Sequence, residues 1–225
     1  PMIMFREDPL RILRMYRFAH RFDLKVDQDL RSAARMLCGL LAEKKKIISR
    51  ERINEEFIKI ASLPKCADAF RDMIYDGVMH HIFPKLSGFL GKSYHFSELS
   101  ILESTLKTVG EISLIDDSYQ VRIAALLEDT LDLIGSSYTL EKDLEALKFS
   151  NNDIELITHI ANQAARLVME LGWFLQDEEM PTERYVRHSL HFFGDNHKEI
   201  IALAKIKYKY LHPEIKGMFD IYMSL

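Results

Sequence analysis

Apolar side chains recur every three or four residues along nearly the whole chain, with polar side chains between them. This spacing is typical of helices that bury one face. After Ser49, for example, Ile53, Phe57 and Ile60 follow one another at intervals of four and three residues. No segment alternates apolar and polar side chains convincingly, as a half-buried strand does. The pattern predicts an all-α protein.

Start and stop signals set the bounds of the predicted helices. Asp8 can cap the first one, and Pro9 takes a position whose backbone N–H has no helical partner. Leu63-Pro64 and Asp76-Gly77 end two others. The predicted helices cover residues 9–22, 27–42, 49–63, 66–75, 97–114, 118–134, 140–147, 151–175, 182–193, 196–210 and 213–223.

A loop-rich stretch divides these helices into two groups. Residues 81–95 contain Pro84, Gly88 and Gly91, the residue types that interrupt helices. A chain of 225 residues with 48% hydrophobic residues is long enough for one large core or two small ones. We predict two helical domains, residues 1–92 and residues 93–225.

Charge is distributed unevenly between the two groups. Residues 1–95 hold 18 Lys and Arg against 12 Asp and Glu, a net charge of +6. Residues 96–225 hold 12 against 22, a net charge of −10. This asymmetry favours contact between a polyanion and the first half alone. The alternative is two solvated surfaces whose charges differ by chance.

Composition also indicates the cellular compartment in which the protein works. Its two cysteines, Cys38 and Cys66, form no CxxC pair, which favours a reducing environment over a disulfide-bonded secreted one. No apolar run approaches the roughly 20 residues of a membrane-spanning helix, and the N-terminus does not read as a signal peptide. We therefore expect a cytoplasmic protein with no membrane partner.

The segment Phe5–Phe18 carries the candidate chemistry. Asp8 and Arg11 stand three residues apart across a helix start, so their side chains can point the same way. A carboxylate can accept from the exocyclic amine of cytosine or adenine, while the guanidinium donates to the neighbouring ring acceptor. Uracil and guanine leave both groups unpaired. The pair predicts a site that accepts C and A and rejects U and G.

Arg14 and Arg17 continue the same three-residue step. They form a row of positive charge suited to a ribose and a triphosphate. The alternative is that Glu7, Asp8 and the arginines form ordinary helix salt bridges. An isolated EDxxR pattern would favour that alternative, so the wider sequence has to decide between them.

Three segments resemble one enzyme family, in the family's order. EDPLRILRMYRFAHRFDLKVD (Glu7–Asp27) resembles the EDxxR nucleotide-selecting motif of class II tRNA nucleotidyltransferases, the CCA-adding enzymes, and of bacterial poly(A) polymerases. ISRERINEEFIKIASLP (Ile48–Pro64) resembles the next family motif, which supports that helix. GVMHHIFPKL (Gly77–Leu86) resembles the segment that closes the body domain. The three segments are spread over residues 7–86 of the first predicted domain.

This resemblance implies a role for each matching residue. Asp8 and Arg11 would read the base of the incoming nucleotide, and Arg14 and Arg17 would contact its sugar or phosphates. The residues that would support the nucleotide-selecting helix are Glu51, Arg52 and Glu56. Residues 1–92 would then be a neck and body that bind RNA, and residues 93–225 a tail.

The family's catalytic head has a Gly-Gly turn, an Asp-x-Asp pair that holds Mg²⁺ and an Arg-Arg-Asp motif. The chain has no Gly-Gly and no Arg-Arg-Asp, and its one Asp-x-Asp, Asp27-Gln28-Asp29, follows the nucleotide-selecting motif instead of standing in a head that precedes it. Without paired carboxylates for the metal, attack by a 3′ hydroxyl on an α-phosphate lacks electrostatic stabilisation. We expect the sequence, which opens at Pro1, to be a piece of a longer enzyme. We expect no catalytic residue, no Mg²⁺ site and no nucleotide addition in this piece alone.

The second half resembles the HD domain that is often fused to these enzymes. Where that domain has "EHTL" and "R-x-A-x-L-x-HD-x-G-K", this chain has Glu103–Leu106 and Arg122–Leu131. Ser104 and Glu128 replace the two metal-ligand histidines, and only Asp129 remains. A serine hydroxyl is a poor ligand for a transition metal. We expect a helical scaffold without a metal, and an HD-type phosphohydrolase is the alternative.

The resemblance implies CCA addition from CTP and ATP to tRNA 3′ ends, with no DNA partner. A bacterial poly(A) polymerase, which acts on other RNA 3′ ends, shares the EDxxR helix and is the near alternative. The C-terminal stretch HPEIKGMFDIYMSL is not basic, which favours tRNA. A stand-alone RNA-binding helical module is a third possibility. The motif does not distinguish CCA addition from addition of A only or CC only.

Overall fold

The computed structural model describes residues 1–42, 48–89, 92, 100–131, 140–211 and 218–224. The α-helices within these residues are α1 (Met2–Glu7), α2 (Leu10–Arg21), α3 (Gln28–Leu37), α4 (Arg50–Ala61), α5 (Cys66–Tyr75), α6 (Ile101–Ile115), α7 (Tyr119–Leu127), α8 (Leu140–Ala146), α9 (Asn151–Gln176), α10 (Glu183–Phe193), α11 (His197–Leu211) and α12 (Met218–Ser224). Short 3₁₀ helices are η1 (Cys38–Leu41), η2 (Met79–His81), η3 (Pro84–Phe89), η4 (Glu128–Thr130) and η5 (Gly194–Asn196).

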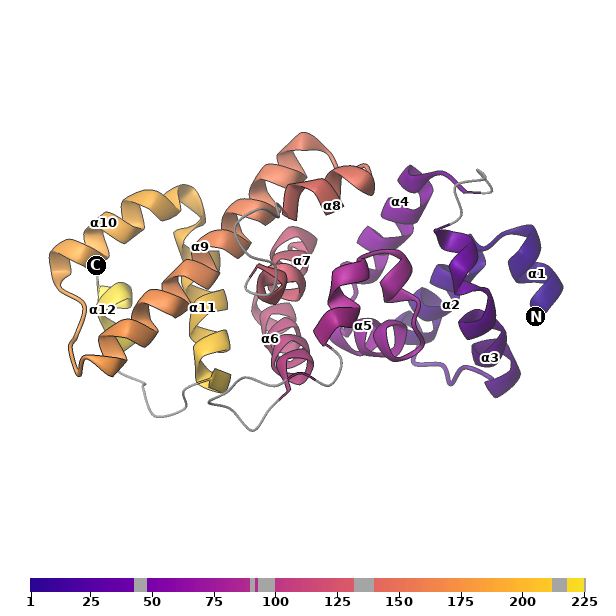
Figure 1. The fold of residues 1–225 in the computed structure, drawn as a ribbon, viewed down its shortest axis with the longest axis horizontal. Coiled ribbons are helices and arrows are strands. Elements are labelled where there is room, and N and C mark those ends of the chain that lie inside the picture. Colours follow the sequence, from indigo (N-terminus) through magenta and orange to yellow (C-terminus); the bar gives the residue numbers. More distant parts are fainter. Residues whose placement is uncertain (43–47, 90–91, 93–99, 132–139, 212–217, 225) are drawn as a thin grey trace.

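The described residues contain no β-strand, which confirms the predicted all-α class. The helices form an elongated row that broadly follows the chain (Figure 1). Helices α1–α5 lie at one end, α6 and α7 lie in the middle, and α9–α12 extend to the other end. Among all the residues that the structure describes, no helix combines the length and the hydropathy needed to cross a membrane.

Side-chain caps begin most of the longer helices. The Asp27 carboxylate accepts from the backbone N–H of Asp29 and Leu30 at the start of α3. The residues that cap α4, α6, α7, α9 and α10 in the same way are Ser49, Ser100, Ser118, Ser150 and Thr182. The predicted cap at Asp8 is shifted by one residue, because Pro9 is the N-cap of α2, although Asp8 Oδ1 accepts from the N–H of Leu10 at 3.3 Å.

Helix bounds differ from the sequence prediction in three places. Residues 27–42 do not form one helix, because α3 ends at Leu37 and the chain tightens into η1. The predicted helix over residues 118–134 ends at Leu127 and is followed by η4, and residues 132–139 lie outside the described part. The short helix α1 was not predicted, since its six residues are too few for a readable apolar period.

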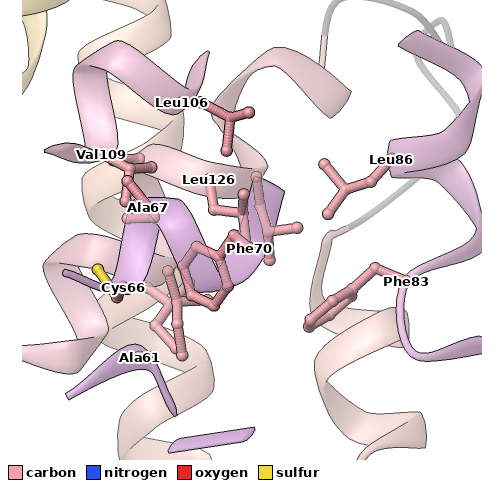
Figure 2. Close-up of a cluster of buried hydrophobic side chains, with 14 of the residues drawn as sticks. Ala61, Cys66, Ala67, Phe70, Phe83, Leu86, Leu106, Val109 and Leu126 are labelled. Carbon is pink, nitrogen blue, oxygen red and sulfur yellow. The ribbon is translucent and has the colours of Figure 1, made fainter. Parts of the chain in front are cut away.

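The two halves of the chain meet through the packing of α5 on α6. Figure 2 shows Cys66, Ala67 and Phe70 of α5 among Leu106 and Val109 of α6 and Leu126 of α7. All of these side chains are buried, and they belong to one continuous apolar core. Small side chains on α5 allow the close approach of α6 at this junction.

Arg122 of α7 reinforces the junction with hydrogen bonds. Its Nη1 donates to the carbonyl oxygens of Ala61 (3.2 Å) and Leu63 (3.1 Å), at the end of α4. Its Nη2 and Nε donate to the carbonyl oxygens of Ser113 (3.2 Å) and Asp116 (3.0 Å) in the second half. The predicted domain boundary between residues 92 and 93 stays a prediction, and the packing on either side of it is continuous.

Candidate functional site

Helix α2 buries one face against α4 and α5 and presents its charged side chains on the other. Its buried residues are Leu10, Ile12, Leu13, Tyr16 and Ala19. This apolar stripe fixes the rotation of the helix. The side chains of Asp8, Arg11, Arg14 and Arg17 therefore remain accessible in part. Helix α2 itself lies towards the end of the molecule that holds the N-terminus (Figure 1).

A buried carboxylate on α4 gathers three cations. The Glu56 side chain is almost fully buried, and Arg17 Nε lies 2.9 Å from its Oε2. Lys59 Nζ donates to Glu56 Oε1 at 3.2 Å, and Arg14 Nε lies 3.6 Å from the same oxygen. A carboxylate buried in this way is stable as an anion only with such partners. Glu56 thus holds the arginines of α2 in place.

Asp8 lies at the other end of the same charged cluster. Its Oδ2 is 3.7 Å from Arg14 Nη1 and 3.9 Å from Arg52 Nη2, both beyond hydrogen-bond distance. Arg14 therefore links Asp8 to Glu56. The two carboxylates face Arg14, Arg17, Arg52 and Lys59, so the cluster carries a surplus of two positive charges. Such a surplus suits an anionic ligand.

Arg11 stands apart from that cluster. Its guanidinium lies 3.7 Å from Glu7 Oε2, and Nη1 donates to the carbonyl oxygen of Met4 at 3.4 Å. Among the described residues, Asp8 and Arg11 pair with different partners rather than with each other. Both side chains are partly exposed, and their contacts are long. Each can therefore exchange these contacts for stronger ones with a bound base.

The three residues expected to support α2 separate into two groups. Arg52 and Glu56 reach α2 from successive turns of α4. Glu51 instead lies exposed in the first turn of α4. Its own backbone N–H and the Ser49 hydroxyl lower the pKa of the Glu51 carboxyl. Glu51 therefore stabilises the start of α4, while Arg52 and Glu56 contact the helix that carries the candidate site.

A second polar network lies on the opposite side of α2. The Asp76 carboxylate, fully buried at the end of α5, accepts from Tyr16 Oη at 2.8 Å, Arg31 Nε at 2.7 Å and Arg35 Nε at 2.6 Å. Arg31 also donates to Asp72, whose other oxygen lies 3.0 Å from His20 Nε2. Burial and the Asp76 charge raise the pKa of Tyr16, which stays protonated as a donor.

This second network was missed from the sequence, although a signal for it exists. Each contributing helix supplies two polar side chains four residues apart on one face. These pairs are Tyr16 and His20 on α2, Arg31 and Arg35 on α3, and Asp72 and Asp76 at α5. Lys59, the third cation of Glu56, was also missed. Its spacing from Glu56 resembles that of an ordinary surface ion pair.

Replacing Asp76 with asparagine is expected to lower the free energy of unfolding by about 2 kcal/mol. The substitution removes the charge that Arg31 and Arg35 share, but both arginines keep access to water. Urea denaturation followed by circular dichroism measures the change. Asp68→Asn is the matched control, because Asp68 pairs with Arg71 at the surface, and its effect should stay below about 0.5 kcal/mol. Equal midpoints for the two variants would contradict this role of Asp76.

Three buried residues, Ser104, Glu128 and Asp129, stand where the sequence led us to expect HD-like positions. Asp129 contacts the ammonium group of Lys207 on α11 and the hydroxyl of Thr105 on α6. Ser104 and Glu128, which directly precede Thr105 and Asp129 in the sequence, are buried as well. Asp129 is therefore engaged in a buried ion pair that joins η4 to α11. Among the described residues, no three His, Cys, Asp or Glu side chains are grouped to hold a metal ion.

Comparison with known proteins adds the family context to this geometry. Residues 23–90 match the family described as "Probable RNA and SrmB- binding site of polymerase A". A curated relative, the "Multifunctional CCA protein" of Shewanella denitrificans, is 27% identical over 143 residues, which cover 61% of this chain. A solved structure described as "The complex structure of CCA-adding enzyme with CTP" has the same fold, with a TM-score of 0.65 at 17% identity.

The chain spans only part of each of these relatives. The matched region covers 34% of the curated protein, and 99% of this chain covers 48% of the solved one. The family match includes α3, α4 and α5, and the last two of these pack against α2. The sequence matches and the shared fold thus make the chain similar to part of the CCA-adding enzymes and, over residues 23–90, to a described binding site of polymerase A.

Proposed function

We propose that the α1–α5 half of the chain selects the incoming nucleotide and binds the RNA 3′ end in a tRNA nucleotidyltransferase that adds C-C-A from CTP and ATP. The observation that carries this proposal is the environment of Asp8. Its carboxylate accepts one long hydrogen bond from Leu10 N–H, and its cationic neighbours stand beyond hydrogen-bond distance. The carboxylate therefore keeps acceptor capacity beside a positively charged cluster.

Base selection follows from the donors and acceptors of the two side chains. Asp8 accepts from the exocyclic amine of cytosine or adenine, and Arg11 donates to the adjacent ring nitrogen. A uracil or guanine would bring a carbonyl towards the carboxylate and an N–H towards the guanidinium. Both mismatches leave polar groups without partners, which is how a hydrogen-bonding site rejects the wrong substrate.

The remaining cations would bind the sugar and phosphates of the nucleotide. Arg14 and Arg17 share the single charge of Glu56 with Lys59. Their guanidinium groups are thus held in position while most of their charge stays available to a phosphate. Glu56 has a positioning role in this proposal, since it contacts the arginines and not the nucleotide.

Nucleotide transfer itself would need groups outside these residues. The family context implies Mg²⁺, yet Asp129 faces Lys207, and the other described acids form no metal-binding group. We propose that the metal ions are held by a catalytic domain outside this chain, and that residues 1–225 alone add no nucleotide. The chain's own contribution is to orient the base and to exclude mismatched ones.

Poly(A) polymerase is the second candidate, favoured by the family description that matches residues 23–90. The similarity to the multifunctional CCA protein and the weakly charged C-terminal stretch favour tRNA instead. An HD-type phosphohydrolase is disfavoured, because Lys207 already neutralises the one remaining motif acid.

One assay separates these functions. The protein encoded by the complete reading frame that contains this chain is incubated with Mg²⁺, a tRNA that lacks its 3′ end, and the four nucleoside triphosphates singly and together. Sequencing the products should reveal C-C-A. Long tracts of A would identify a poly(A) polymerase. Absence of any added nucleotide would contradict both functions and leave an RNA-binding module.

A further inference from the structure

Two aromatic rings lie exposed beside arginines at the C-terminal end of α2. Phe18 and Phe22 have exposed fractions of 41% and 58%, although large apolar side chains are usually buried. Their rings are nearly parallel, with an interplanar angle of 17° and centroids 6.1 Å apart. We name the set Arg17, Phe18, Arg21 and Phe22 the arginine–phenylalanine ladder.

The guanidinium group of a neighbouring arginine lies over each ring of the ladder. Arg17 Cζ lies 4.4 Å from the centroid of Phe18, and Arg21 Cζ lies 5.5 Å from that of Phe22. Cation–π attraction holds such pairs together at an exposed site. The rings and the planar guanidinium groups therefore form one continuous surface of flat π-systems with positive charge along it.

A hollow of about 380 Å³ adjoins the ladder. It is lined by Arg17, Arg21, Lys59, Ser62, Leu63 and Pro64, from α2 and the end of α4. Glu56 offsets only one of its charges, because Arg17 and Lys59 share that carboxylate. Arg21 forms no ion pair with any described residue. The hollow therefore attracts an anion of roughly the size of a sugar phosphate.

We propose that the ladder binds a single strand of RNA, with bases stacked on Phe18 and Phe22 and a backbone phosphate in the adjoining hollow. Aromatic platforms beside a positively charged groove are the features that bind single-stranded nucleic acid. A protein covering this face would instead have to bury Arg21 without a partner, which is costly. The alternating charge and flat rings therefore favour RNA over a protein partner.

The position of the ladder relates this surface to the proposed nucleotide site, and this step rests on the proposed function. Phe18 and Phe22 stand about 15 and 21 Å along the helix from Asp8, at about 1.5 Å per residue. The ladder would thus hold nucleotides that precede the reacting 3′ end, while Asp8 and Arg11 read the incoming base. Stacking accepts all four bases, so this contact should be independent of sequence.

Fluorescence anisotropy with a labelled 12-nucleotide single-stranded RNA tests the ladder in the 225-residue chain. The double variant Phe18→Leu, Phe22→Leu keeps apolar bulk but removes the π-faces, and it should weaken binding about 10-fold. Phe18→Tyr, Phe22→Tyr keeps the rings and should bind within about 2-fold of the unmodified protein. Leu114→Ala is the matched control, because Leu114 is an exposed apolar residue on α6, outside the ladder.

Three results would overturn the ladder. One is an unmodified chain that does not bind the single strand. Another is a leucine variant that binds as tightly as the unmodified chain, which would leave these rings to a protein partner. The third is an equal loss of RNA affinity in the leucine and tyrosine variants, which would mean that altered side-chain packing, and not loss of the aromatic faces, weakens binding. A melting temperature for each variant confirms that it is folded.

Failure of the ladder is distinguishable from failure of the proposed function. If the complete protein adds nucleotides but the leucine variant binds RNA as tightly as the unmodified chain, only the ladder is contradicted. Loss of RNA affinity in that variant, with no nucleotide addition by the complete protein, supports the ladder and contradicts the proposed function.

Discussion

Replacing Asp8 with alanine is expected to reduce the preference for C over U on the order of 100-fold in the complete protein, because a site that hydrogen-bonds its substrate rejects mismatches through unpaired polar groups. The carboxylate is the group that would repel the uracil carbonyl. Without it, incorporation of C falls and the barrier against U falls too. The measurement is kcat/KM for each nucleoside triphosphate on tRNA that lacks its last two nucleotides, so that C is the next one added.

Two features of this variant make the test selective. Asp8 also stands near Arg14 and Arg52 at 3.7 and 3.9 Å, so its removal frees positive charge and should not weaken RNA affinity. Asp23→Ala is the matched control, since Asp23 is an exposed acid that follows the same helix and pairs with Lys65. An equal loss of rate for all four nucleotides in Asp8→Ala would remove Asp8 from base selection.

Local patterns were sufficient to predict the all-α class and most of the helices. The period of apolar residues predicted a helix over residues 9–22, and the buried face of α2 in the structure determines that Asp8, Arg14 and Arg17 remain accessible. The same reasoning could not pair Arg11 with Glu7, because several acids and arginines lie within reach of one another on a helix. Only the fold decides among such alternatives.

Contacts between distant residues were beyond sequence reasoning, for a physical reason. Asp129 and Lys207 are 78 positions apart, and nothing in the local pattern around either residue indicates the other. The resemblance to an HD motif singled out Asp129, and its expectation of a lost metal site stays a prediction. Lys207 reaches Asp129 because α11 packs on α6 in the fold. Sequence reasoning thus singled out Asp129 but not Lys207, the cation that faces it.

Arg122→Ala is expected to lower the free energy of unfolding by about 4 kcal/mol, combining lost hydrogen bonds with the cavity left behind. Arg122 is 1% exposed, and its guanidinium donates to four backbone carbonyl groups. Removing it leaves those acceptors without this donor at the junction of the two halves. Arg122→Lys keeps the charge but not the planar fork of donors, so its loss should be intermediate.

Urea denaturation monitored by circular dichroism and by Trp173 fluorescence tests this role. Trp173 lies on α9 in the second half, whereas circular dichroism reports on helices throughout the chain. Arg187→Ala is the matched control, because Arg187 pairs with Glu183 at the surface and should cost less than about 0.5 kcal/mol. A loss below about 1 kcal/mol in Arg122→Ala would remove this residue from the junction.

The same experiment tests how the two halves are coupled. Because α5 packs on α6 in one core and Arg122 bonds to both sides, the unmodified chain should unfold in one transition by both probes. The alanine substitution weakens the junction more than either half, so the two transitions should separate in that variant. Separate transitions already in the unmodified chain would mean that residues 1–92 and 93–225 fold independently, as the loop-rich stretch in the sequence alone suggests.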